Sequence, residues 1–431
     1  MPSRNQNNTT ISVVHEISCG LDVHKNSVSA CLLYSDSSGT EQSEMREFQT
    51  FTDDLIKLKE WLLERECPVI AMESTGPYWT PVHNVLEDSV KVILVNARHM
   101  RNVPGHKTDI SDSRWLAGLL RHGLLKAAFI PPKHQRQWRD LTRMRRNYKE
   151  DLGDFQRRVH KLFQQSNIKI DSVVSDLFGA TGRNLMKLLI SGNNSPTISE
   201  VENCLRGSLQ DKAAELHRSV QGFFEAHHRF LLSLLLNTIE NLETQISILE
   251  SRIKEVMRDA QEAIRRLEEI PGVGAVSSHA ILAEIGPTLT EFPTAHALAS
   301  WCGLSPGNNQ SGGKRFSGKS PVKKNHLKTI MVEVAWPAIK ARGSYYRAKY
   351  YALKARLGAK KAIIAVAHKI LKTIYHVLKY GVHFKDLGET YLLERNREAK
   401  IKYLTWQASL IGYELVPLDQ PAATAQAPIF T

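Results

Sequence analysis

The sequence predicts an α/β domain at the N-terminus, a long helical region in the middle and a mainly helical, basic domain toward the C-terminus. Strand-like and helical patterns alternate between residues 17 and 130, and no convincing strand follows from Pro131 to about residue 270. Apolar residues recur at heptad spacing within that second stretch. Alternating strands and helices are typical of a mixed α/β sheet, and a sustained heptad repeat is typical of a coiled coil.

The N-terminal pattern predicts three strands, then a helix, a strand, a helix, a strand and a helix. The segment ISCGLDVHKNSVSACLLY (17–34) predicts two strands around a tight turn at His24–Asn26, and a third strand follows near 43–51. The remaining elements are FTDDLIKLKEWLLER, PVIAME (68–73), PYWTPVHNVLED, VKVILV (90–95) and a helix that begins near Asp109. Helical spacing of apolar residues and short, continuous apolar runs distinguish the helices from the buried strands.

The middle region contains a long basic helix and a heptad repeat. The helix is RQWRDLTRMRRNYKEDLGDFQRRVHKLF, and the repeat consists of Leu232, Leu235, Ile239, Leu242, Ile246, Leu249, Ile253 and Val256. Such a repeat predicts a coiled coil, formed either by a hairpin within one chain or by contact between two chains. The sequence does not distinguish these two arrangements.

The C-terminal third is strongly basic and yet folded. Residues 312–380 contain seventeen Lys and Arg residues and one acidic residue, Glu333. Such a run suggests an interaction surface, and the helical spacing of AIIAVAHKILKTIYHVLKYG (362–381) predicts a folded domain. The predicted organisation is a disordered tail (1–14), an α/β domain (15–131), a helical, coiled-coil linker and oligomerisation region (132–265), a basic helical domain (266–385) and a C-terminal extension and tail (386–431).

Composition limits the function further. The net charge of +13 and the pI of about 9.4 indicate either a polyanionic partner, most often nucleic acid, or a generally basic protein. No apolar run reaches the roughly 20 residues of a membrane span, and MPSRNQNNTT has no apolar signal core. The cysteines are odd in number and form no Cys-x-x-Cys pair, which argues against a disulfide framework and a zinc knuckle. We therefore expect a cytoplasmic protein without membrane partners.

Four carboxylates are candidates for a metal site. Asp22 and Glu73 lie where predicted strands end, and Asp109 and Asp112 share one face of the first turn of a helix. If the first and fourth strands are neighbours, all four converge, and their mutual repulsion favours bound cations. Two Mg²⁺ ions about 4 Å apart would hold a phosphodiester between them. Alternatively, Asp109 is a helix N-cap and Asp112 an acid favoured by the helix dipole, while Asp22 is a turn residue and Glu73 a surface residue.

Two glycine-containing segments are candidates for phosphate contacts. PGVG (271–274) resembles the turn of a helix-hairpin-helix module, whose backbone N–H groups bind phosphate. Taken alone, the motif is more often a tight turn between helices. Ser311 precedes two glycines and then Lys314 and Arg315, which would stabilise an alkoxide and a pentacovalent phosphate. A serine ester would conserve the energy of a broken phosphodiester. Ser305, Ser317 and Ser320 are nearby alternatives.

Several motifs resemble the DEDD-motif transposases of the "one-hundred-ten" insertion-sequence family, which includes the Piv invertases. The N-terminal motifs are GLDVHK (20–25), MESTGPY (72–78), NARH (96–99) and KTDISDSRWLA (107–117), and LAGLLRHGLLK (116–126) followed by FIPP resembles the "eleven-eleven" subgroup. The resemblance implies a RuvC-like, ribonuclease-H-like fold for this domain. It also implies that Asp22, Glu73, Asp109 and Asp112 are catalytic residues that bind Mg²⁺, with a two-metal site expected.

The C-terminal half resembles the serine-bearing domain of the same family. The matching motifs are PGVG and AEIG, FPTAHALASWCGLSPGNNQSGGK, VAW (334–336) and AIIAVAHKIL (362–371). The resemblance places the nucleophile at Ser311. One departure is that Lys324 precedes Asn325 where many members have glycine. The expected nucleic-acid contacts are Lys107, Gly272, Gly274, Gly312, Gly313, Lys314, Arg315, Lys319, Lys323 and Lys324.

The resemblance implies a DNA recombinase that excises and inserts its own element. In that family the carboxylate domain of one subunit meets the serine domain of another, so a dimer that pairs into a tetramer is expected. It also implies donor and target DNA and a guide (bridge-type) noncoding RNA as partners. Two alternatives are a RuvC-like metal nuclease or resolvase in which water attacks, and a non-catalytic protein that binds RNA or DNA.

Overall fold

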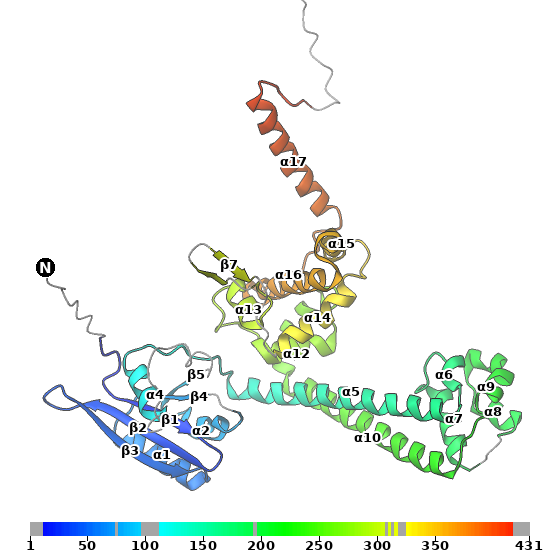
Figure 1. The fold of residues 1–431 in the computed structure, drawn as a ribbon, viewed down its shortest axis with the longest axis horizontal. Helices are drawn as coiled ribbons and strands as arrows, with labels where there is room; N and C mark the ends of the chain where they lie inside the picture. The colour runs from blue at the N-terminus through cyan, green and yellow to red at the C-terminus, as the bar shows by residue number, and fades with distance from the viewer. Residues whose placement is uncertain are drawn as a thin grey trace, which may run out of the picture. The chain divides into compact units, whose positions relative to one another are not determined.

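The computed structural model forms two compact units, Met1–Ile130 and Pro131–Thr431 (Figure 1). It describes residues 12–73, 76–95, 112–192, 196–306, 309–311, 314–317 and 325–416. Within these ranges, no helix combines the length and the apolar character needed to cross a membrane. All five cysteines lie in the described residues and form no disulfide there. Burial raises the pKa of Cys67 to about 11 and that of Cys302 to about 12.

The first unit is built on one mixed five-stranded sheet. Its strands are β1 (Ser18–Val23), β2 (Ser27–Ser35), β3 (Glu41–Gln49), β4 (Val69–Glu73) and β5 (Lys91–Val95), in the spatial order β3-β2-β1-β4-β5. β2 is antiparallel to both of its neighbours, β1 and β3, and β4 and β5 run parallel to β1. The predicted α/β architecture is therefore correct. β1 and β4 are neighbours at the centre of the sheet, as convergence of the carboxylates requires.

Helices cover both faces of this sheet. They are α1 (Thr52–Glu64), α2 (Trp79–Leu86) and α4 (Asp112–Arg121). Buried residues of α1 and α2 share one core with the residues of β1 that point to the same face, Cys19, Leu21 and Val23. Leu116, Leu119 and Leu120 of α4 pack on the opposite face. Side chains along a strand alternate between the two faces of the sheet. The two cores therefore show which face each residue of β1 and β4 points to.

A glycine lets α4 lie directly on β1. A Cβ atom at Gly20 would be 2.0 Å from the carbonyl oxygen of Ser113 and 2.5 Å from the amide nitrogen of Ala117. The Ser18 hydroxyl donates to the Ala117 carbonyl at 3.3 Å. Because Ser113 lies over Gly20 and Ala117 lies near Ser18, the N-terminus of α4 is directed toward the carboxyl end of β1.

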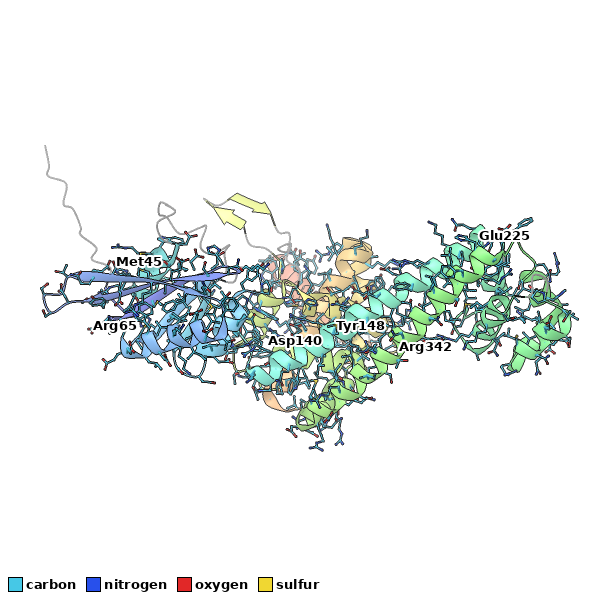
Figure 2. All side chains as sticks on the ribbon, turned by 90° about the horizontal axis from the view of Figure 1, so that it is seen from below. Met45, Arg65, Asp140, Tyr148, Glu225 and Arg342 are labelled. Carbon is cyan, nitrogen blue, oxygen red and sulfur yellow. The ribbon has the colours of Figure 1, made fainter. Side chains whose placement is uncertain are left out.

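The second unit begins with an antiparallel pair of long helices, α5 (Lys133–Gln165) and α10 (Ala226–Val256), which lie side by side in Figures 1 and 2. The Trp138 indole donates to the Val256 carbonyl at 3.2 Å, and Arg145 pairs with Glu250 at 2.8 Å. The heptad residues Leu232, Ile239 and Ile246 are buried in a core shared with α5, and Leu235 and Leu242 pack against that core. The heptad repeat is thus covered within one chain.

Short helices close the far end of this pair. They are α6 (Ile170–Val173), α7 (Ala180–Ile190), α8 (Ile198–Cys204) and α9 (Ala213–Ser219). Their apolar side chains belong to the core that α5 and α10 share. α8 begins with a capping box in which Thr197 and Glu200 satisfy each other's backbone N–H groups.

The rest of the unit is a helical domain with one small hairpin. Its elements are α11 (Gln261–Glu268), α12 (Ala275–Ile285), α13 (Ala295–Cys302), β6 (Asn309–Ser311), β7 (Lys314–Ser317), α14 (His326–Ala338), α15 (Tyr345–Leu357), α16 (Ala359–Tyr380) and α17 (Tyr391–Leu410). α16 contacts α11, α13, α14 and α15 and is buried along most of its circumference. The sequence predicted a mainly helical domain and did not predict the hairpin, whose strands are only three and four residues long.

A buried ion pair attaches α5 to this domain. Glu284 on α12 is 3% exposed, and it accepts hydrogen bonds from Arg143 at 2.9 and 3.0 Å. Arg139 lies 3.4 Å from the same carboxylate and donates to the Ala283 carbonyl. Burial lowers the pKa of Arg139 to about 10, and the Glu284 charge opposes that shift.

Replacing Glu284 with glutamine leaves two arginines without their counter-charge, one of them buried. We expect a loss of about 3 kcal/mol in the free energy of unfolding, since removing one partner of a buried pair strands the other charge. Urea denaturation followed by circular dichroism measures this loss. Glu240→Gln is the control because its pairs with Lys187 and Arg183 are more exposed, and such pairs contribute below about 1 kcal/mol. Equal losses of unfolding free energy in the two variants would contradict a stabilising role for the ion pairs of Glu284.

Candidate functional site

The carboxyl ends of β1 and β4 bring Asp22 and Glu73 next to each other. Leu21 is the register partner of Met72 across the parallel pair, and each carboxylate residue directly follows. Neighbouring strands lie about 4.8 Å apart. The two residues that the sequence singled out therefore occupy matching positions on adjacent strands.

Both carboxylate positions belong to the α4 face of the sheet. Leu21 packs in the core on the opposite face, while Gly20 faces α4. By alternation, Asp22 shares the face of Gly20. On β4, Ala71 packs with Leu116 of α4, which places Glu73 on this face as well.

α4 adds a third carboxylate at the same edge. Asp112 is the first residue of α4 and precedes Ser113, whose carbonyl lies over Gly20. The helix N-terminus also carries a partial positive charge that favours nearby carboxylates. The alternative role of Asp112 as an acid favoured by the helix dipole is thus compatible with a ligand role. Asp109 lies outside the described residues.

The donor chemistry of this edge suits a divalent cation. Carboxylate oxygens are the ligands that Mg²⁺ prefers in proteins. The Asp22 side chain is 29% exposed and lies 3.2 Å from Nε2 of His24. Within the described ranges, no three His, Cys, Asp or Glu side chains are already close enough together to hold an ion. The backbone therefore brings together three of the four predicted positions, and metal binding by them remains a prediction.

The predicted nucleophile lies at the end of a hairpin strand. Ser311 is the last residue of β6 and the register partner of Lys314, the first residue of β7, which Arg315 follows. The alternative Ser305 is 7% exposed, and its hydroxyl accepts a hydrogen bond from Ser300 at 3.4 Å. Burial makes Ser305 a poor nucleophile for a polymeric substrate. The candidates Lys107, Gly312, Gly313, Lys319, Ser320, Lys323 and Lys324 lie outside the described residues.

Asn325, which follows the position where the sequence departs from the family pattern, has a clear structural role. Its side-chain oxygen accepts from the Lys328 amide at 3.2 Å and so caps α14. Its side-chain nitrogen donates to the Trp301 carbonyl at 3.1 Å. This residue thus ties the start of α14 to α13, which lie on either side of the hairpin in the chain.

The two glycines of PGVG have different surroundings. Gly272 has a φ of +88°, and a Cβ there would lie 2.3 Å from the Val334 carbonyl, so helix packing accounts for this glycine. Gly274 caps α12, its N–H donates to Ser277 at 2.9 Å, and a Cβ there would meet no atom within 4 Å. The interpretation as a tight interhelical turn explains Gly272 without any phosphate.

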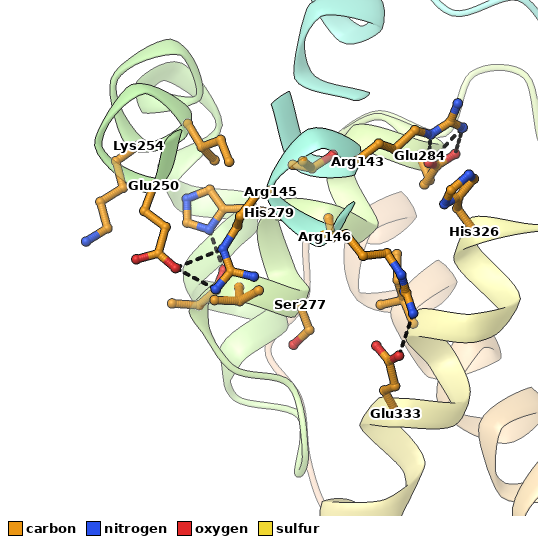
Figure 3. A pocket seen from close by; sticks show the side chains of 16 residues that line it. Arg143, Arg145, Arg146, Glu250, Lys254, Ser277, His279, Glu284, His326 and Glu333 are labelled. Carbon is orange, nitrogen blue, oxygen red and sulfur yellow. Dashed lines mark hydrogen bonds and ion pairs between the residues drawn. The ribbon is translucent and has the colours of Figure 1, made fainter. Parts of the chain in front are cut away.

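A cavity of about 260 Å³ opens between α5, α10, α12 and α14 (Figure 3). Three arginines of the basic helix α5 line it, and each is paired with a glutamate from another helix: Arg143 with Glu284, Arg145 with Glu250 and Arg146 with Glu333. These arginines join helices to one another and are largely neutralised. The sequence shows the positive charge of α5, but it does not show this pairing.

Family models match both halves of the chain. A model described as "Transposase" (DEDD_Tnp_IS110) matches residues 19–168, and a model described as "Transposase IS116/IS110/IS902 family" matches residues 264–352. The two segments together cover more than half of the chain and place it in the transposase class. The chain belongs to the IS110 family of insertion-sequence transposases.

Two curated proteins that are similar to this chain are also named as transposases. The "Mini-circle putative transposase for IS117" of Streptomyces coelicolor is 26% identical over 46% of this chain and 46% of its own length. The "Transposase for insertion sequence element IS1111A" of Coxiella burnetii is 26% identical over 41% of this chain and 53% of its own length. The chain thus spans about half the length of these relatives.

Among solved structures, the Fowlpox virus resolvase in complex with Holliday junction DNA is similar to part of the chain. The identity is 16%, the match covers 21% of this chain and 64% of the resolvase, and the TM-score is 0.17.

Proposed function

We propose that this protein is a DNA transposase that cuts and rejoins strands at the ends of an insertion element. The observation that carries the proposal is the match of two transposase family models, in order along the chain. The carboxylate edge of the first unit and the serine hairpin of the second fall within these matches. The basic composition suits a nucleic-acid substrate.

The carboxylates of Asp22, Glu73, Asp109 and Asp112 would hold divalent metal, with Mg²⁺ favoured by an all-oxygen donor set. A bound divalent ion supplies charge stabilisation for the phosphodiester under attack. Of these residues, Asp22 and Glu73 lie on adjacent strand ends, and Asp112 begins a helix packed against the sheet. Such rigid placement is what orients a phosphate for in-line attack.

Ser311 would act as the nucleophile. Its Oγ forms a bond to phosphorus as the hydroxyl loses its proton, and the displaced DNA oxygen takes up a proton. A hydroxyl of the second DNA strand then attacks the phosphoserine, which restores the serine and joins the strands. Lys314, paired with Ser311 in register, and Arg315 would stabilise the developing negative charge.

The proposed assembly brings the carboxylate domain of one copy to the serine domain of another, in a dimer that pairs into a tetramer, with a bridge-type guide RNA as further partner. Because Leu232, Ile239 and Ile246 of the heptad repeat are buried in a core shared with α5 of the same chain, the proposed contacts between copies use other surfaces. The proposed site of action is the prokaryotic cytosol. Sequencing the RNA that co-purifies with the protein tests the guide.

Ser311→Ala tests the chemical step. Purified protein, with any RNA it carries, is incubated with Mg²⁺ and DNA that spans the junction between the element and its flank. On denaturing gels we expect a protein–DNA adduct from the unmodified protein and a loss on the order of 10³-fold or more in the variant. Ser317→Ala is the control and retains the adduct. Undiminished cleavage by Ser311→Ala would favour the metal nuclease in which water attacks.

A further inference from the structure

One face of α16 carries a line of four lysines and one histidine. Lys361, Lys369, Lys372, His376 and Lys379 recur every three, four or eight residues and so lie within one narrow sector of the helix. We call these five residues the α16 basic stripe. At 1.5 Å per residue the stripe extends over about 27 Å. Lys361, His376 and Lys379 are exposed, Lys369 and Lys372 are half-buried, and the opposite sectors of α16 form the domain core.

Neighbouring elements add charge of the same sign at the middle of the stripe. Lys349 on α15 and Lys369 both lie 5.8 Å from the centre of the Tyr345 ring. Burial lowers the pKa of Lys369, and the charges of Lys372, Lys349 and Arg395 lower it further. Burial and the Arg395 charge likewise lower the pKa of Lys349. Every charged neighbour that contributes to these two shifts is a cation.

The stripe differs in this respect from the arginines of α5. Each arginine that lines the cavity in Figure 3 has a glutamate partner, whereas no carboxylate in the described part of the chain pairs with a lysine of the stripe. Contact with the Tyr345 ring compensates only part of the cost of placing cations together and partly out of water. The arginines of α5 and the α16 basic stripe look alike in the sequence. In the described part of the chain, only the stripe lacks carboxylate partners, so its charge is available to another molecule.

We propose that the α16 basic stripe binds the phosphate backbone of a nucleic-acid strand. A single phosphate would occupy one or two of these cations, whereas a line of about 27 Å matches several consecutive phosphates. At the C-terminal end of the stripe, Tyr380 is 67% exposed and stacks on His376, with ring centres 5.7 Å apart. An exposed aromatic ring beside backbone-binding cations is suited to a stacked base. The proposal rests on the proposed function and assigns this surface to its substrate DNA or to an RNA partner.

The test compares two double variants with the same change in net charge. Lys369→Gln with Lys372→Gln removes the centre of the stripe. Lys57→Gln with Lys187→Gln is the control, because Lys57 pairs with Asp54 at 2.9 Å and Lys187 pairs with Glu240 at 3.3 Å. Dissociation constants are measured by fluorescence anisotropy over a salt series, with labelled duplex DNA and with single-stranded RNA of equal length.

We expect the slope of log affinity against log salt to fall by about 0.9 per stripe lysine with duplex DNA, or by about 0.7 with a single strand. The control keeps the slope of the unmodified protein. A smaller slope with one probe alone assigns the stripe to that nucleic acid. A smaller slope with both probes shows that the stripe binds the backbone of DNA and of RNA. Slopes equal to the control with both probes overturn the proposal. Failure of the unmodified protein to bind either probe would instead refute the proposed function.

Thermal unfolding provides an independent check. Because the stripe lysines repel one another in the free protein, the Lys369→Gln and Lys372→Gln variant should melt at the same or a higher temperature than the unmodified protein. A clear decrease would show that these lysines stabilise the fold, and this would also overturn the proposal.

Discussion

Asp22→Asn should abolish Mg²⁺-dependent DNA cleavage, with a loss on the order of 10³-fold or more, while nucleic-acid binding persists. The variant keeps the size and the hydrogen-bonding capacity of the side chain and removes one negative charge. Asp22 shares the carboxyl edge of the sheet with Glu73, and α4 directs Asp112 toward that edge. Loss of this charge weakens the attraction for a divalent ion that must neutralise both the carboxylates and the phosphate.

Metal binding can be followed without activity. We expect Mg²⁺ to raise the melting temperature of the unmodified protein and to have a much smaller effect on Asp22→Asn, because binding to the native state alone stabilises it. Asp36→Asn is the matched control, since Asp36 lies in the turn after β2, where hydrogen bonds from Ser38 and Gln42 lower its pKa to about 2. Full cleavage by Asp22→Asn, or an equal loss in Asp36→Asn, would refute the proposed site.

Gly20→Ala should be among the most destabilising single substitutions in the first unit. The added methyl group would lie 2.0 Å from the Ser113 carbonyl oxygen and 2.9 Å from Cβ of Leu116. Backbone cannot yield as a flexible side chain does, so α4 must move away from β1. We expect a loss of about 3 kcal/mol or more in the free energy of unfolding, at the upper end of the range for overpacked cores. Urea denaturation measures it.

The matched control lies on α4 itself. A Cβ at Gly118 would meet no atom within 4 Å, so Gly118→Ala should stabilise the helix by about 0.5–1 kcal/mol. Any folded Gly20→Ala protein should also have weak cleavage activity, because displacement of α4 carries Asp112 with it. Similar stabilities for the two alanine variants would refute the contact between α4 and β1.

The strands and the carboxylates could be predicted because their signals are local. The apolar runs around Ile70 and Leu94 and the turn at His24–Asn26 specify strands from a few neighbouring residues. Asp22 and Glu73 could then be placed at strand ends, and only the adjacency of β1 and β4 had to be assumed. The requirement for glycine at position 20 could not be predicted, since it depends on Ser113 and Ala117, far along the chain.

The remaining features depend on which distant partner each side chain meets. The heptad repeat shows an apolar stripe, but it contains no signal for the helix that covers it. The net charge likewise does not reveal that Arg143 pairs with Glu284, whereas the charged neighbours of Lys369 include two other lysines, Lys372 and Lys349. The hairpin that carries Ser311 was missed because strands of three and four residues are too short to show alternation.

The antiparallel packing of α5 and α10 has a consequence for how this protein can change over evolution. Trp138 and Val256, separated by 118 positions in the chain, are joined by a hydrogen bond at the open end of the helical pair. The polypeptide therefore enters α5 and leaves α10 at nearly the same place. Whole turns can be gained or lost at the far end, equally in both helices, without altering the anchorage of the serine-bearing domain. Such a change would alter the length of the helical pair and leave the packing at its open end intact.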